Sequence, residues 1–158
     1  MTAPMTAPMI ALLDVNMLIA LMDPKHVHHT RARQWWAAEK AGEKAGDKAA
    51  GWASCPITQN GFLRIVTQSA YPNRFPLPDA LAILRRATAL PGHMFWPDDL
   101  SLLDDTAIDH TRLLGPRQIT DAYLLGLAVR RGGRLVTLDT GISVGVVRGA
   151  ELKHLLTI

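Results

Sequence analysis

The sequence predicts an α/β domain built on a mainly parallel sheet. Short apolar runs recur along the chain, and segments with helical patterns separate them. The runs at 9–14 and 134–139 each stop at an aspartate, which is typical of a buried strand bounded by a polar turn. Strands that alternate with helices are joined by crossover connections, so neighbouring strands run parallel.

Length and composition fit one globular domain. The chain has 158 residues, of which 48% are hydrophobic and 20% charged. The formal charge of +3 is compatible with a polyanionic partner, but the basic residues are scattered and do not indicate one alone. Cys55 is the single cysteine, which excludes an internal disulfide and suits a reducing cytoplasm. No apolar run approaches the roughly 20 residues of a membrane span.

The N-terminus lacks the features of a targeting segment. Residues 1–8 repeat the letters MTAP and have neither a basic region nor an apolar core, so we expect no signal peptide there. We expect a disordered leader over 1–8, a single domain over 9–158, and Met9 as a plausible alternative start.

The first half of the chain alternates strand and helix. A strand at 9–14 leads into a short helix at 16–23, and a long helix is expected over 26–51, with a polar tail. A brief strand at 52–55 then precedes a helix whose first residue is Pro56, a position that proline favours.

The second half repeats the alternation. The proline-rich stretch 71–78 is expected to be loop, before a helix over 79–90 and a strand over 93–96. The segment 102–115 is expected to hold one or two short helical turns. Residues 119–133 form the clearest helix, capped by Thr120, ended by Gly132 and apolar on nearly every face, so it should be buried. The C-terminus, 151–158, supplies a last strand.

Three aspartates are expected to converge at one edge of this sheet. Asp14 and Asp139 follow two strands, and Asp121 lies in the first turn of the helix that leads into the second of them. Ligands of open parallel sheets bind outside the carboxyl ends of the strands, where the strand order reverses. Crowded carboxylates repel one another and favour a hard divalent cation such as Mg²⁺. Taken singly, each aspartate also fits a helix cap or a helix-dipole partner.

Three segments resemble the PIN domain, and more narrowly the VapC-type toxins of bacterial toxin–antitoxin pairs. They are LLDVNMLIALMDPKHVHH, CPITQNGFLRIV and ITDAYLLGLAVRRGGRLVTLDTGI. The resemblance implies a five-stranded parallel sheet with helices on both faces, a Rossmann-like three-layer domain. It also implies a cytoplasmic endoribonuclease that uses Mg²⁺ or Mn²⁺ to activate a water, a small VapB-type antitoxin as partner, and a homodimer.

The resemblance assigns roles to particular residues. Asp14, Asp121 and Asp139 match three acidic positions of the family and imply the metal ligands. Gln59 falls where the family often has a glutamate, so it is expected to face the site as a neutral residue. Asn16 and Thr137 match polar positions that could orient Asp14 or a metal-bound water, although Asn16 also fits a helix N-cap.

Two rival functions remain open. One is a PIN-fold module that binds RNA or protein with attenuated or lost nuclease activity, because Gln59 is not acidic. The other is a phosphoryl-transfer domain, such as a receiver or a haloacid-dehalogenase-like phosphatase, although LLDVN lacks the second aspartate of the latter.

Asp98 and Asp99 are expected to be turn residues at the sheet edge. The sequence identifies neither the RNA target nor the nucleic-acid-binding residues; basic residues such as Arg33, Arg64, Arg112 and Arg117 are candidates for phosphate contacts.

Overall fold

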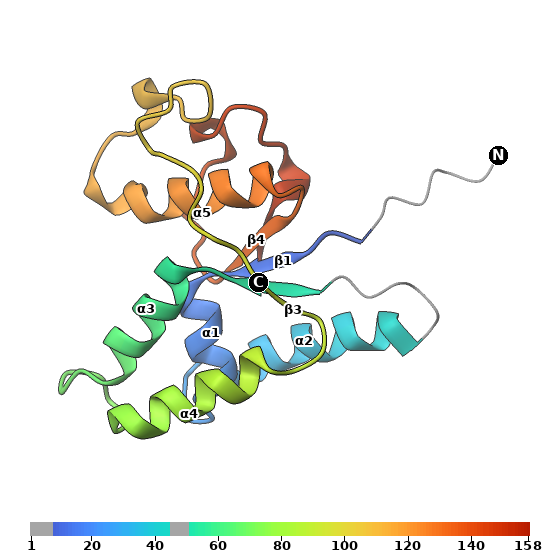
Figure 1. Cartoon of the computed structure of the whole chain (residues 1–158), viewed down its shortest axis with the longest axis vertical. Helices are drawn as coiled ribbons and strands as arrows, with labels where there is room; N and C mark the ends of the chain where they lie inside the picture. Colours follow the sequence, from blue (N-terminus) through green and yellow to red (C-terminus); the bar gives the residue numbers. More distant parts are fainter. Residues whose placement is uncertain (1–7, 45–50) are drawn as a thin grey trace.

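One five-stranded parallel sheet forms the centre of the protein. Figure 1 shows the computed structural model, which describes residues 8–44 and 51–158. The strands are paired in the order β3-β2-β1-β4-β5, and every pair is parallel, which confirms the predicted sheet. Their bounds are β1 Ala11–Leu13, β2 Trp52–Ser54, β3 His93–Phe95, β4 Arg134–Thr137 and β5 Leu155–Thr157. The expected leader, except for Pro8, and the helix tail at 45–50 lie outside the described residues.

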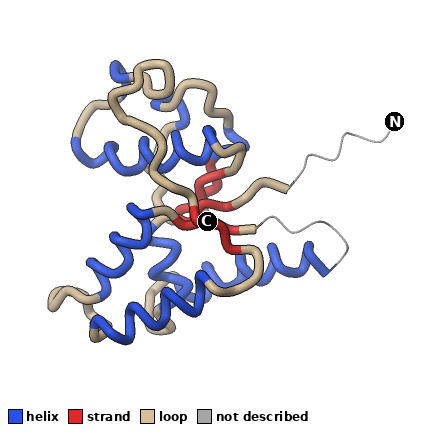
Figure 2. The backbone as a smooth tube through the Cα atoms, in the orientation of Figure 1, coloured by secondary structure: helices blue, strands red, loops and turns tan. Residues whose placement is uncertain are grey.

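Helices cover both faces of the sheet, so the domain has the three layers expected from the sequence (Figures 1 and 2). One face carries α1 (Val15–Met22), α2 (His29–Lys44), α3 (Pro56–Val66) and α4 (Leu77–Thr88). The other carries α5 (Ile119–Arg130) and the irregular segments around it. Among the described residues, no helix is long and apolar enough to cross a bilayer.

The alternation of side chains along the central strands creates two hydrophobic cores. Leu12 of β1 and Leu135 of β4 are paired in register and pack in the cluster that contains α5. Leu13 and Val136, one residue further along, belong to the cluster with α1 and α3. Successive side chains of a strand point to opposite faces, so these short strands hold both layers of helices.

The chain reverses direction across the sheet between β1 and β4. It runs outward from β1 to β2 and β3 at one edge, then returns to place β4 on the other side of β1. The backbone N–H of Asp14 donates to the carbonyl of Val136 at 3.0 Å, which extends the β1–β4 pairing into the turn after β1. Asp14 therefore lies at the topological switch point, the usual position of a ligand site in this class of fold.

Several helix ends differ from the sequence-based expectation. The helix α4 begins at Leu77, so Pro78 lies in its first turn, where its missing N–H has no intrahelical partner to lose. Thr120 is not the cap of α5, because the helix already starts at Ile119. The helix α2 starts at His29, after a turn at 26–28. Gly132 ends α5 as expected, with a φ of 66° that favours glycine.

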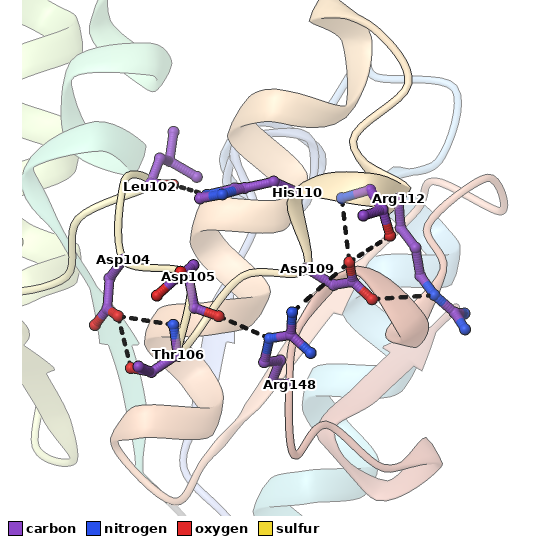
Figure 3. A network of polar contacts seen from close by, with 9 residues as sticks. Leu102, Asp104, Asp105, Thr106, Asp109, His110, Arg112 and Arg148 are labelled. Carbon is purple, nitrogen blue, oxygen red and sulfur yellow. Dashed lines mark hydrogen bonds and ion pairs between the residues drawn. The ribbon is translucent and has the colours of Figure 1, made fainter.

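A polar network holds the long segment between β3 and α5 (Figure 3). The Asp109 carboxylate accepts from the N–H and hydroxyl of Thr111 and forms ion pairs with Arg112 and Arg148. Arg148 also donates through Nε to the carbonyl of Asp105 at 2.7 Å. These contacts tie residues 105–112 to the loop after β4, which fixes the path of the chain into α5.

Phe62 should contribute much of the packing between α3 and the sheet. Its side chain is fully buried, whereas Phe95 on the edge strand β3 is 53% exposed. We expect Phe62→Ala to lower the free energy of unfolding by about 3–5 kcal/mol, because it leaves a cavity in the core. Phe95→Ala should cost about 0.5 kcal/mol or less. Urea unfolding of both variants measures the difference, and equal losses would contradict this account of the core.

Candidate metal centre and active site

Asp14 is a buried carboxylate held from two directions. It directly follows β1, caps the N-terminus of α1, and is only 6% exposed. Its Oδ1 accepts the N–H of Val15 at 2.7 Å and its Oδ2 accepts the hydroxyl of Thr137 at 2.7 Å. Burial raises the pKa of Asp14, and these two hydrogen bonds oppose that effect by stabilising the ionised form.

The Thr137 hydroxyl is oriented by the groups around it. A hydroxyl has one proton, and Thr137 donates it to Asp14. Its oxygen accepts from Asn16 Nδ2 at 3.2 Å and from the N–H of Asp139 at 3.0 Å. Asn16 in turn accepts the N–H of Leu138 at 3.1 Å through Oδ1. Both polar residues singled out from the sequence therefore act on the orientation of Asp14, and the N-cap of α1 is Asp14 and not Asn16.

Asp121 and Asp139 lie within electrostatic reach of Asp14. Asp121, in the first turn of α5, is partly buried, and its pKa is raised to about 6 by burial first and then by the charges of Asp14 and Asp139. Asp139 is exposed beyond β4 and accepts the N–H of Gly141 at 2.7 Å through Oδ1. The structure thus brings the three predicted aspartates to one edge of the sheet.

The donor atoms of this cluster suit a hard divalent cation. Carboxylate oxygens are the ligands that Mg²⁺ and Mn²⁺ prefer, and a positive charge would relieve the repulsion of Asp121 by Asp14 and Asp139. Within residues 8–44 and 51–158, however, no three His, Cys, Asp or Glu side chains are gathered closely enough to hold a metal ion by themselves. That arrangement fits Mg²⁺, which commonly takes one or two carboxylates and completes its shell with waters and substrate phosphates.

Gln59, which is expected from the sequence to face the site, makes its side-chain contact with β2. Its Nε2 donates to the hydroxyl of Ser54 on β2 at 3.0 Å, and Ser54 Oγ lies 2.8 Å from His93 Nε2 on β3. The next residue, Asn60, lines the cavity that contains Asp14, whereas Gln59 does not. Consecutive helical residues differ in direction by about 100°, so the two amides serve different faces of α3.

An open cavity of about 500 Å³ lies beside the aspartates. One wall is α3, and Asp14, Val15, Thr120 and Asp98 complete it. The α3 residues that line it repeat at helical spacing: Pro56, Ile57, Asn60, Gly61, Arg64 and Ile65.

Asp98 lines the cavity, a position that the sequence did not predict. The sequence placed both Asp98 and Asp99 in a turn away from the switch point, and only Asp99 has a clearly structural contact, with Arg130 at 3.4 Å and Arg131 at 2.8 Å. Asp98 instead lines the cavity with Asp14. The irregular segment after β3 carries it there from the sheet edge, and no periodic pattern in the sequence shows that path.

The fold and the aspartate cluster define a known class of domain. A profile of the PIN domain family matches residues 11–144. The chain belongs to the PIN domain family, as its sequence motifs indicated.

Within the PIN domain family, this chain is similar to proteins named as VapC ribonucleases. The chain is 48% identical to Ribonuclease VapC44 of Mycobacterium tuberculosis over 148 residues, covering 94% of this chain and 99% of that protein. It is 45% identical to Ribonuclease VapC38 of the same organism over 150 residues, with the same coverage. A crystal structure of Mycobacterium tuberculosis VapC20, described as a sarcin-ricin loop cleaving toxin, superposes with a TM-score of 0.54 over 78% of this chain and 85% of that one. At 10% identity, this last likeness shows the fold alone.

Replacing Asp121 should stabilise the metal-free protein at high pH. The folded pKa of about 6 lies above the ordinary value of 3.8, so folding binds a proton between these values and ionised Asp121 destabilises the fold above them. In the presence of a chelator, Asp121→Asn should raise the melting temperature at pH 8 by about 2–4 °C and leave it nearly unchanged at pH 4. Asp105→Asn, an exposed control, should do neither. A gain that is equal at both pH values would contradict the electrostatic origin.

The face on which Gln59 lies can be tested with two added charges. Gln59→Glu would put a carboxylate beside Ser54, away from the cavity, so Mn²⁺ affinity should stay within about twofold of the parent. Asn60→Asp would put the charge on the cavity wall that Asp14 shares, and should tighten Mn²⁺ binding. Calorimetry on both variants separates the two positions. The reverse order of affinities would restore Gln59 to the site-facing position that the sequence implied.

Proposed function

We propose that the protein is the toxin of a type II toxin–antitoxin system, a metal-dependent endoribonuclease that hydrolyses RNA phosphodiester bonds. The observation that carries this proposal is the meeting of Asp14, Asp121 and Asp139 at the switch point, where burial and then the charges of Asp14 and Asp139 raise the pKa of Asp121 to about 6. The ribonuclease names of the VapC relatives, 48% and 45% identical over nearly the whole chain, support the same activity. An RNA substrate implies that the protein acts in the cytoplasm.

Mg²⁺ or Mn²⁺ is the proposed cofactor, with Asp14, Asp121 and Asp139 as the residues that would hold it. When bound, such an ion supplies Lewis-acid stabilisation of a phosphoryl oxygen and lowers the pKa of a coordinated water.

The protein's own residues keep the carboxylates ready for that ion. Thr137 donates to Asp14 and so holds one carboxylate oxygen in a fixed direction, while Val15 N–H holds the other. Asn16 and the N–H of Asp139 direct the Thr137 hydroxyl. Asp121, with a pKa of about 6, is close to the range in which a carboxylate can accept or release a proton near neutral pH.

The proposed partners follow from the same reasoning. The VapC names of the relatives support a cognate VapB-type antitoxin, whose simplest inhibitory contact would be an Arg or Lys side chain on the aspartates in place of the metal. A homodimer through apolar helix faces of the N-terminal half remains part of the proposal.

Nuclease activity should depend on the metal and on each aspartate. We expect cleavage of RNA with Mg²⁺ or Mn²⁺ and none with a chelator. Asp14→Asn, Asp121→Asn and Asp139→Asn should each lower the rate by about 100-fold or more, because each removes stabilisation worth several kcal/mol. Asp105→Asn should cleave as the parent does. Full activity in the chelator, or turnover of a phosphomonoester in place of RNA, would refute the proposed reaction.

A further inference from the structure

The cavity beside the aspartates has a composition that the metal centre does not explain. Only Asp14 belongs to both. Its other polar lining residues are a guanidinium, an amide, a carboxylate and a hydroxyl, from Arg64, Asn60, Asp98 and Thr120. A volume of about 500 Å³ lies within the range of small-molecule sites and leaves room for one nucleotide.

The Arg64 guanidinium has no partner among the described residues, although its charge in the last turn of α3 suits the helix dipole. It is exposed on the α3 wall of the cavity, with no hydrogen bond or ion pair there. Other arginines do hold the fold together: Arg130 and Arg131 bind Asp99, and Arg134 binds Glu39 at 2.9 Å. An arginine left free beside an acidic centre suits an anion such as a phosphate, to which its planar group can donate two hydrogen bonds.

Asp98 is exposed at the cavity, but its charge reaches buried groups on both neighbouring helices. Burial raises the pKa of Tyr123 on α5 to about 12, and the charge of Asp98 adds to this effect. Burial likewise raises the pKa of Cys55, the residue before α3, and Asp98 again contributes. Asp98 lines the cavity together with Pro56 and Ile57 at the start of α3 and Thr120 in the first turn of α5. A carboxylate there would repel a phosphate but accept hydrogen bonds from base N–H groups.

We propose that this cavity is a nucleotide subsite next to the cleavage site, in which Arg64 contacts an RNA phosphate and Asn60 and Asp98 hydrogen-bond the edge of one base. The inference rests on the proposed ribonuclease function. Because Asp14 lines both the metal centre and the cavity, a strand with its scissile phosphate at the aspartates places a neighbouring nucleotide here. Proteins read single-stranded RNA by binding unstacked bases in such pockets, where the apolar Val15, Ile57 and Ile65 offer contact area.

The phosphate contact is tested by binding. The parent and the variants carry Asp139→Asn, so that RNA is bound without being cut, and the probe is short single-stranded RNA of randomised sequence. Arg64→Ala should weaken binding equally for all sequences and lower the slope of log affinity against log salt by about 0.7. Arg86→Ala, an exposed arginine of α4, is the matched control and should leave both unchanged. If Arg64→Ala behaves like Arg86→Ala, the phosphate contact is refuted.

The base contact is tested by cleavage preference. With Asp139 intact, Asn60→Ala and Asp98→Ala should each change the preference at one nucleotide position beside the cut by on the order of tenfold, without changing Mn²⁺ affinity. An unchanged preference would refute the base contact. Weaker Mn²⁺ binding in Asp98→Ala would overturn it as well, because Asp98 would then be a metal ligand. If the ribonuclease proposal itself were wrong, the parent protein would cleave no RNA, and this outcome is distinct from an unchanged cleavage preference.

Discussion

The arrangement of the proposed site depends on one buried hydrogen bond, from the Thr137 hydroxyl to the Asp14 carboxylate at 2.7 Å. It joins the ends of β1 and β4, the two strands between which the chain reverses across the sheet. An ionised carboxylate that is only 6% exposed needs such partners, because burial alone favours its protonated form. Since Asp14 also caps α1, the start of that helix, the β1–β4 pairing and the orientation of the carboxylate are a single structural unit.

The same unit explains which parts of the site the sequence predicts. Asp14 and Asp139 follow strands of a parallel sheet, and the ends of neighbouring parallel strands must meet at one edge. The rotation of α3 about its axis is not predicted by the sequence. Neighbouring helical residues differ in direction by about 100°, and both Gln59 and Asn60 are amides, so either could face the site. Gly61 indicates the rotation of α3. A Cβ there would lie 2.6 Å from Val15 Cγ2, so this glycine marks the face of α3 that meets α1. Asn60 and Arg64 flank that face, and Gln59 does not.

The path of residues 97–109 is the second feature that periodicity does not reveal. The segment has no regular element, and its position depends on long-range contacts such as Asp99 with Arg131 and Arg148 with Asp109. Two adjacent aspartates therefore have different surroundings. Asp99 pairs with arginines at the C-terminal end of α5, and Asp98 lines the cavity. Sequence neighbours in a loop share no face, unlike residues of a helix or strand, so a common role cannot be assumed for them.

The distribution of charge around the cavity offers a reason why α3 carries no carboxylate on the wall that it contributes. Negative charge is concentrated at the ends of β1 and β4 and at the start of α5, where burial and then the charges of Asp14 and Asp139 raise the pKa of Asp121. The facing wall of α3 carries Asn60 and the cation Arg64. A carboxylate at the position of Asn60 would strengthen the hold on a cation but would also pair with Arg64, one helical turn away, and compete with phosphate for it. A neutral and basic wall would separate the two proposed tasks: the aspartates would hold the metal, and α3 would remain free to attract the RNA backbone.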